Sequence, residues 1–319
     1  MKILIASSIH TEAIDQLQER YDVCCAFNAQ EEELKQRISD SEVLIFRSGV
    51  QITAEVMACA PHLKLLVRAG SGLDNLDLEY VRRRGLKLIR VPGPGAQAVA
   101  EMSFALMLTL SRQILEADRL LRRGRWAKHE LEGSLLRGGV LGIIGAGNIG
   151  ARVGEMGAFW GMQVIGCVEH PSPARAASLG EKGVRLVDYQ EVLVNADFIS
   201  IHVPLKDSTR NLIEDKALSL VKPGAFLINL ARGGVVDESA LFRALEKGRL
   251  RGAALDVHSE EGEGKISPLA VLPNVVLTPH IGAMTIDSQR QIGERVVEII
   301  DCYSDGQALS VIPEDVAVL

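Results

Sequence analysis

The sequence has few cysteines, no long hydrophobic run and no cluster of basic residues, and each absence excludes a class of protein. Its five cysteines are an odd number with no CxxC spacing, which argues against a disulfide framework and against a zinc site. No apolar run approaches the roughly 20 residues that span a membrane, and the N-terminal run is too short for a signal peptide. We therefore expect a cytoplasmic protein with no metal and no membrane partner.

The net charge and the distribution of basic residues also argue against nucleic-acid binding. The 35 Lys and Arg residues are dispersed and outnumbered by 41 Asp and Glu residues, which leaves a formal charge of −6. Because phosphate neutralisation needs a clustered basic face, we expect no nucleic-acid partner. What the sequence does have is 47% hydrophobic residues and 30 scattered glycines over 319 residues. This composition excludes collagenous and disordered chains and predicts a globular protein with two domains.

Short apolar runs alternate with helical patterns along the chain. This alternation predicts parallel strands with crossover helices. Six runs in the second half suit a complete dinucleotide-binding sheet. The first series of runs lies near residues 3–6, 43–46, 65–67 and 86–89, and the second near 140–144, 162–166, 197–201, 225–229, 251–255 and 275–278.

Two helical patterns predict how the domains connect. Residues 91–95, V-P-G-P-G, are helix-breaking and indicate a hinge. One helix is expected over residues 96–121; its first half is apolar nearly all round, which is typical of a homodimer interface or of a buried interdomain helix. A final helix near residues 285–304 should pack back on the first domain. We therefore expect a discontinuous domain of residues 1–98 and 286–319, with residues 99–285 inserted as a second domain.

Residues 145–150, G-A-G-N-I-G, stand directly after a predicted strand and before a predicted helix. Such glycines allow a tight turn that brings backbone N–H groups, here at Gly145, Gly147, Asn148, Ile149 and Gly150, to a pyrophosphate at the positive end of the helix. The next strand is followed by Glu169, where a ribose hydroxyl needs an acceptor. A carboxylate there repels a 2′-phosphate, so the sequence favours NAD over NADP.

Three polar residues follow predicted strands: Arg232, Glu261 and His280. Taken singly, each has a structural explanation, since Arg232 could pair with Asp237, Glu261 belongs to an acidic run, and His280 could be an interior histidine. Parallel strands present their carboxyl ends at one edge, however, and ligands bind there. Together the three suit oxidoreduction of a 2-hydroxy acid, because arginine binds a carboxylate, histidine moves a proton and a carboxylate favours imidazolium.

The stretches N-L-A-R-G-G-V-V-D-E-S-A-L at 229–241, A-A-L-D-V-H-S-E-E at 253–261 and T-P-H-I-G-A at 278–283 strongly resemble the D-isomer-specific 2-hydroxyacid dehydrogenase family. The stretch R-A-G-S-G-L-D-N-L-D at 68–77 is most similar to the D-3-phosphoglycerate dehydrogenase branch. The resemblance implies two doubly wound α/β lobes with a cleft between them: a flavodoxin-like substrate domain and an inserted Rossmann domain through which the chain dimerises.

The resemblance also assigns roles to residues. It makes Arg232, Glu261 and His280 the catalytic set, and it places the substrate carboxylate at the backbone of Ser71 and Gly72. Arg47 matches a basic residue of phosphoglycerate dehydrogenases. The cofactor-lining positions it implies are Val203, Pro204, Ala231 and Asp256, with Asp256 near the nicotinamide carboxamide.

Three departures from the family pattern limit these assignments. Val168 stands where the family usually has its ribose-binding Asp, so Glu169 would substitute from one position later. Gly49 stands where some members have a second Arg, which weakens the expectation of phosphate recognition. Since the sequence stops at Leu319, we expect no appended regulatory domain.

The sequence thus predicts an NAD-dependent dehydrogenase acting on a D-2-hydroxy acid, with 3-phosphoglycerate among the candidates. One alternative is hydroxypyruvate or glyoxylate reductase activity on a non-phosphorylated acid. A second is an NAD(H)-sensing binding protein resembling transcriptional corepressors. Chemistry like that of formate dehydrogenase is disfavoured, because Glu261 stands where such relatives carry Gln.

Overall fold

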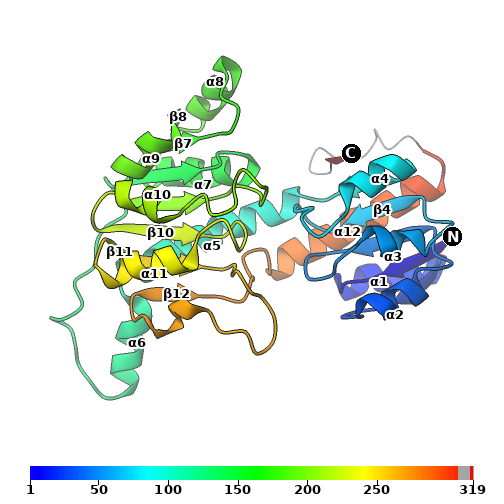
Figure 1. Cartoon of the computed structure of the whole chain (residues 1–319), viewed down its shortest axis with the longest axis horizontal. Helices are drawn as coiled ribbons and strands as arrows, with labels where there is room; N and C mark the ends of the chain where they lie inside the picture. The colour runs from blue at the N-terminus through cyan, green and yellow to red at the C-terminus, as the bar shows by residue number, and fades with distance from the viewer. Residues whose placement is uncertain (308–316, 319) are drawn as a thin grey trace. The chain divides into compact units, whose positions relative to one another are not determined.

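The computed structural model describes residues 1–307 and 317–318, and the chain divides into two compact units. Unit 1 comprises Met1–Ala98 with Ala283–Leu319, and unit 2 comprises Val99–Gly282. Both are α/β, with helices on the two faces of a mainly parallel sheet (Figure 1). The predicted fold class is confirmed.

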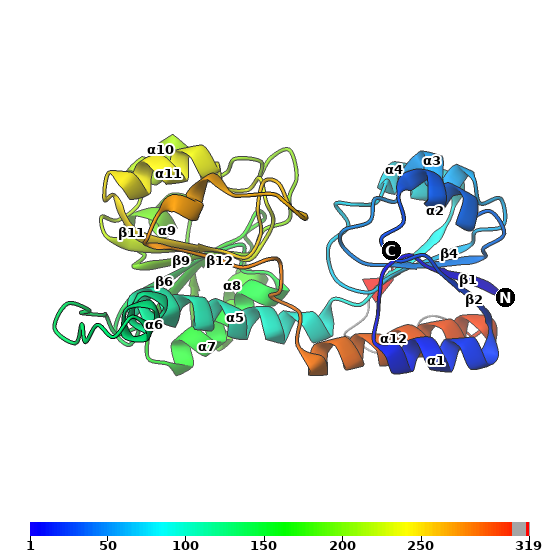
Figure 2. The same cartoon turned by 90° about the horizontal axis from the view of Figure 1, so that it is seen from below.

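Unit 1 has the strand order of a flavodoxin-like sheet, β13-β5-β4-β3-β1-β2, parallel except for β13. Helices α1 and α12 pack side by side on one face and α2, α3 and α4 cover the other (Figure 2). Burial on both faces explains why β3 and β4 are apolar at almost every position. The elements are β1 (Lys2–Ile5), α1 (Thr11–Arg20), β2 (Asp22–Cys25), α2 (Glu31–Arg37), β3 (Val43–Phe46), α3 (Ala54–Ala58), β4 (Leu65–Arg68), α4 (Leu78–Arg84), β5 (Lys87–Arg90), α12 (Ile286–Ser304) and β13 (Ala317–Val318).

Unit 2 contains a seven-stranded parallel sheet in the order β12-β11-β10-β9-β6-β7-β8, which is a Rossmann sheet with one added strand. The strand order reverses direction at β6, so the turn after β6 lies at the position where dinucleotides bind. The elements are β6 (Val140–Ile144), α7 (Asn148–Phe159), β7 (Gln163–Cys167), α8 (Pro173–Glu181), β8 (Val184–Leu186), α9 (Tyr189–Asn195), β9 (Phe198–Ile201), α10 (Asp215–Leu220), β10 (Ala225–Asn229), α11 (Glu238–Glu246), β11 (Leu250–Leu255), the 3-10 helix η1 (Pro268–Val271) and β12 (Val275–Leu277).

The single helix expected over residues 96–121 is wrong. The structure has two helices, α5 (Gly93–Ser111) and α6 (Ile114–Arg122), bent by 58° at a break where Gln113 is left-handed with φ 52°. The expectation that residues 91–95 break the helix is wrong for residues 93–95, because α5 begins at Gly93 and holds Pro94 in its first turn, where proline is tolerated. Their role as a hinge stays a prediction. Among the described residues, no single helix suits a membrane span, and α5 with α6 meets the length and composition test only as a bent pair.

Candidate active site

The turn between β6 and α7 has the geometry of a phosphate cradle. Gly145 has φ 94°, and a Cβ there would lie 2.8 Å from the carbonyl of His202. A Cβ on Gly150 would lie 2.3 Å from the carbonyl oxygen of Gly145, whereas Gly147 faces open space. The first backbone N–H groups of α7 have no partner within the helix and carry its positive dipole end. These residues fit the pyrophosphate of a dinucleotide.

Acidic and basic groups follow the strands on either side of this turn. Glu169 lies just after β7, and its Oε2 pairs with Nζ of Lys206, 2.8 Å away in the segment after β9. The hydrogen bond and charge of Lys206 hold the pKa of the Glu169 carboxyl below its usual value. Val203 and Pro204 belong to the same segment, and the Cγ1 of Val203 lies 2.7 Å from where a Cβ on Gly145 would be. The sequence did not point to Lys206.

His202, at the end of β9, is a second residue that the sequence analysis missed. Its Nε2 lies 2.8 Å from Oγ of the buried Ser200. Part of the residue surface is accessible, but Nδ1 is buried without a hydrogen-bond partner in the described chain. Burial lowers the pKa of His202 to about 3. The imidazole is therefore neutral at physiological pH, and the backbone carbonyl of His202 packs against Gly145 of the glycine turn.

A buried neutral histidine makes stability depend on pH. Between the ordinary pKa of 6.5 and about 3, the unfolded chain binds a proton at His202 that the folded chain excludes. Stability should therefore fall as pH drops through this window, by roughly 1.4 kcal/mol per pH unit from this group. We expect His202→Gln, which can still bond Ser200, to flatten the dependence of urea midpoints on pH between 6 and 4. A slope equal to that of the wild type would contradict this assignment.

Strands β10, β11 and β12 are neighbours in the sheet of unit 2 (Figure 1). The predicted catalytic residues Arg232, Glu261 and His280 follow the carboxyl ends of these strands in the sequence. The structure brings two of them into contact: Nδ1 of His280 lies 2.9 Å from Oε2 of Glu261. Oε1 of Glu261 accepts a bond from the backbone N–H of His258 at 3.2 Å. Burial by itself would raise the pKa of the Glu261 carboxyl, but the hydrogen bonds and charge of its partners outweigh burial, so the pKa is lowered. Nε2 is left as the ring nitrogen for proton transfer.

Arg232 lies on a turn whose backbone is hydrogen-bonded by the side chain of Asn229. The side chain of Asn229, 1% exposed, accepts a bond from the N–H of Ala231 and donates one to the carbonyl of Arg232. The next residue must be small, because a Cβ on Gly233 would lie 1.7 Å from the carbonyl oxygen of His258. The Arg232 turn thus packs on the backbone from which the Glu261 loop starts.

The turn that carries His280 is shaped by Asp256, which is 2% exposed. The Asp256 carboxylate accepts bonds from the hydroxyl of Thr278 at 2.6 Å and from the N–H groups of Ile281 and Gly282 at 2.9 and 2.7 Å. His280 itself has φ 56°, a conformation that a non-glycine residue keeps only when its surroundings impose it. Asp256 therefore fixes the backbone conformation of the turn that carries His280. The family resemblance additionally implies that Asp256 contacts the cofactor.

The predicted substrate residues of unit 1 follow neighbouring strands. Arg47, after β3, donates from Nη1 to Oε1 of Gln289 at 2.6 Å, and burial lowers its pKa. Ser71 and Gly72 follow β4, and their carbonyl oxygens accept bonds from two further arginines that the sequence analysis missed. These are Arg90, at 3.1 Å, and Arg68, at 2.7 Å. Binding the carbonyls in this way leaves the amides of the loop for an anion.

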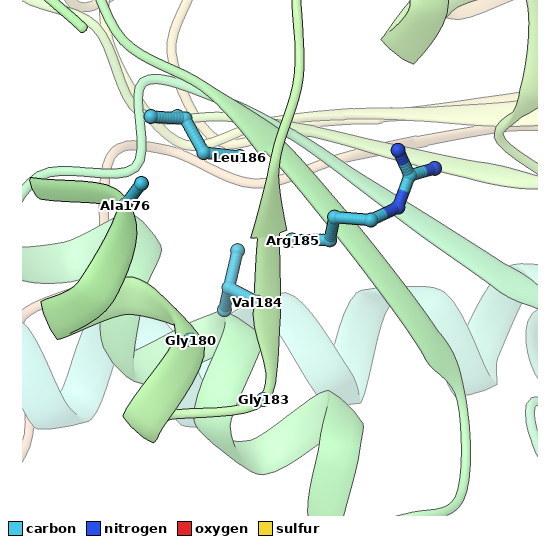
Figure 3. A pocket seen from close by; sticks show the side chains of 6 residues that line it. All are labelled: Ala176, Gly180, Gly183, Val184, Arg185 and Leu186. Carbon is cyan, nitrogen blue, oxygen red and sulfur yellow. The ribbon is translucent and has the colours of Figure 1, made fainter. Parts of the chain in front are cut away.

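The remainder of the described chain shows neither a metal site nor a second catalytic cluster. Its His, Cys, Asp and Glu side chains form no group of three that could hold a metal. A shallow apolar pocket lies between α8 and β8 at the far edge of the sheet from β12 (Figure 3). Arg185, its one charged lining residue, points away from Ala176 and Val184 and pairs with Glu191 at 2.8 Å. This pocket presents no acid or base.

The fold and the glycine turn of unit 2 define a dinucleotide-binding protein. Residues 104–282 match the NAD binding domain of D-isomer specific 2-hydroxyacid dehydrogenases. The chain belongs to this family, and unit 2 is its NAD-binding domain.

Named relatives agree with this placement. The chain is 40% identical to D-3-phosphoglycerate dehydrogenase of Methanocaldococcus jannaschii over 94% of this chain and 57% of that protein. It is 38% identical to hydroxypyruvate reductase of Thermotoga maritima over 85% of this chain and 87% of that protein. It thus spans a little over half the length of the first of these relatives.

Two solved structures share the fold over at least 95% of the chain. D-lactate dehydrogenase from Aquifex aeolicus, complexed with NAD and lactic acid, has a TM-score of 0.86 and 30% identity, covering 95% of this chain and 96% of that one. An acyclic imino acid reductase in complex with NADPH and D-Arg also has a TM-score of 0.86 and 30% identity, covering 99% of this chain and 100% of that one.

Proposed function

We propose that the protein is an NAD-dependent oxidoreductase that transfers a hydride between NAD(H) and a D-2-hydroxy acid or its 2-keto acid. The observation that carries this proposal is the hydrogen-bonded pair of His280 and Glu261, at the strand ends of an NAD-binding domain that also present Arg232. These groups supply the proton donor and the carboxylate-binding cation that the reaction needs.

The cofactor would be held by residues of unit 2. The turn of residues 145–150 binds the pyrophosphate with its backbone amides, Glu169 accepts bonds from the adenosine ribose, and Val203, Pro204, Ala231 and Asp256 line the remainder. When bound, NAD(H) supplies or accepts the hydride.

The remaining chemistry belongs to side chains. Arg232 binds the substrate carboxylate and polarises the carbonyl. In the reducing direction, Nε2 of His280 donates a proton to the oxygen as its negative charge develops, and in the oxidising direction it removes that proton. Glu261 orients the ring through Nδ1 and stabilises the imidazolium.

Unit 1 is proposed as the substrate domain, with Arg47, Ser71 and Gly72 as its binding residues. Gly49 has φ 90°, which an Arg side chain rarely tolerates, so a second cation is not readily accommodated there. With Arg47 as the one proposed cation here, the site does not discriminate between 3-phosphoglycerate and a small non-phosphorylated acid such as hydroxypyruvate or glyoxylate. The relatives from T. maritima and M. jannaschii carry names of both kinds.

A steady-state screen tests this proposal. NADH oxidation should be measured with hydroxypyruvate, phosphohydroxypyruvate, glyoxylate and pyruvate, and at least one should be reduced with saturation kinetics. NADH binding without turnover of any of the four would contradict the enzyme assignment and favour an NAD(H)-sensing protein.

Cofactor preference should depend on Glu169. Glu169→Ala should weaken NADH binding about tenfold or more, the cost of losing a charged hydrogen bond. It should also narrow the preference for NADH over NADPH, because Lys206 is then released to meet a 2′-phosphate. The measurement is kcat/KM for both cofactors, with Glu181→Ala on α8 as the matched control. An unchanged ratio would mean that another residue reads the ribose.

We also propose that the protein is a cytoplasmic homodimer without nucleic-acid or membrane partners. The expectation that the first half of the long helix lies in the dimer interface stays a prediction. Most of its apolar side chains are buried within one chain (Val99, Phe104, Leu106, Met107 and Leu110 are at most 9% exposed), whereas Met102 and Leu108 are partly exposed and Ala105 is exposed. Five free cysteines and the net negative charge suit a reducing compartment and the lack of a nucleic-acid partner.

The surface that would pair lies on α6 and the segment after it. Ile114, Leu115, Leu121, Trp126 and Leu135 are 47 to 78% exposed, an apolar set that monomers seldom leave in water. Light scattering at micromolar concentration should give about twice the chain mass of 34.6 kDa, and Leu121→Lys with Trp126→Lys should lower it. A wild-type mass near 34.6 kDa would refute the dimer.

A further inference from the structure

Glu261 is carried on an exposed loop with little intrinsic rigidity. Residues 259–266 are all exposed, and Gly262 and Gly264 adopt φ values of 126° and 75°. Segments with few buried apolar contacts open easily. The loop therefore needs an anchor if Glu261 is to stay 2.9 Å from His280.

A single buried carboxylate supplies that anchor. Glu238 is 8% exposed; its Oε1 accepts the N–H of Ser259 at 2.7 Å and its Oε2 accepts the hydroxyl of Ser267 at 2.9 Å. The two bonds tie the beginning and the end of the loop to α11. In the described chain, Glu238 and His280 are the side chains outside residues 259–267 that bond to them.

Burial of the Glu238 carboxylate is unfavourable unless its hydrogen bonds to the loop compensate for the loss of water. Removing a carboxylate from water is strongly unfavourable, and a neutral side chain would avoid that cost. Glu238 is the first residue of α11, so the helix dipole offsets part of the penalty. The hydrogen bonds from Ser259 and Ser267 stabilise the carboxylate further.

A short series of hydrogen bonds and one peptide bond connects Glu238 to His280, the proposed proton donor. Ser259, held by Glu238, is covalently joined to His258, whose N–H binds Oε1 of Glu261, and Oε2 of Glu261 binds His280. Building on the proposed function, we propose that Glu238 is a positioning residue that fixes the loop so that Glu261 remains bonded to His280. Glu238 acts through Glu261 and does not itself contact substrate.

The test compares Glu238→Ala with Glu238→Gln and with Glu246→Ala, an exposed acid at the end of the same helix. Glu238→Ala should lower kcat/KM for keto-acid reduction between about 10- and 100-fold, the range that small misplacements cost. It should also move the pH profile of kcat to lower pH, as Glu261→Gln should. Glu238→Gln can accept from Ser259 and donate to Ser267, so it should resemble the wild type, as should Glu246→Ala.

A double-mutant cycle decides whether Glu238 acts through Glu261. Glu238→Ala added to Glu261→Gln should produce little further loss, because the second change acts on a pair already broken. Hydrogen exchange of residues 258–267 should accelerate in Glu238→Ala. If Glu238→Ala does not fold, Ser267→Ala keeps the buried charge and should shift the pH profile in the same direction by less.

The outcomes separate this inference from the proposed function. If the wild type reduces no 2-keto acid, the proposed function fails. If His280→Ala retains full turnover, His280 is not the proton donor. If His280→Ala is inactive but Glu238→Ala and Ser267→Ala keep the wild-type pH profile, or Glu238→Ala adds its full loss to that of Glu261→Gln, then Glu238 does not position Glu261.

Discussion

Replacing His280 with alanine should lower kcat for keto-acid reduction by roughly 10²–10⁴, which is the usual contribution of a positioned acid or base. The reason is that Nε2, the nitrogen left after Nδ1 binds Glu261, would no longer donate a proton to the carbonyl oxygen. NADH affinity should change little, because the proposed cofactor-binding residues do not include His280. Steady-state rates and fluorescence titration with NADH measure the two quantities.

The conformation of His280 requires a second variant. Its φ of 56° strains an alanine, whereas asparagine tolerates the left-handed region well. His280→Asn should therefore keep the turn and still lose the rate, and His62→Ala, an exposed histidine of unit 1, should be unaffected. A folded His280→Asn with wild-type turnover would remove His280 from the mechanism.

Arg232→Gln should produce the second large effect, a loss of roughly 10²–10³ in kcat/KM for the keto acid, comparable with removing a donor that stabilises developing charge. Arg232→Lys should recover only part of the loss, because an ammonium keeps the charge but cannot bind a carboxylate through two parallel hydrogen bonds. The measurement is kcat and KM separately for each variant.

The control for Arg232 is Arg243→Gln. Arg243 is an exposed arginine on α11 that pairs with Asp215, outside the strand ends. Its loss should leave both constants near those of the wild type. If Arg232→Gln instead raised the KM for NADH and spared the keto acid, the carboxylate would be bound by another group.

Much of this architecture could be predicted from the sequence because parallel strands obey strict geometry. The residues after consecutive buried runs must meet at one edge, so Arg232, Glu261 and His280 could be assigned to one site before any contact was known. The turn of residues 145–150 was predictable for the same reason, since its glycines stand between a strand and a helix.

What the sequence could not predict depends on contacts between distant residues or on weak local patterns. Strands β2 and β8 were missed because they are short and only partly buried at the sheet edges. The break at Gln113 has no glycine or proline to mark it. Lys206 and Glu238 bond to residues 37 and 21 positions away, and spacing alone carries no sign of either bond.

The central claim, hydride transfer to a 2-keto acid with proton donation by His280, is tested most directly by isotope transfer. NADH carrying deuterium at both C4 positions of the nicotinamide should be incubated with whichever of hydroxypyruvate, phosphohydroxypyruvate and pyruvate turns over fastest in the steady-state screen, because these three give products with a D or L configuration. The wild type should give a D-2-hydroxy acid with deuterium at C2, and His280→Asn should give very little product. Product of the L configuration, or product from His280→Asn at the wild-type rate, would contradict the central claim.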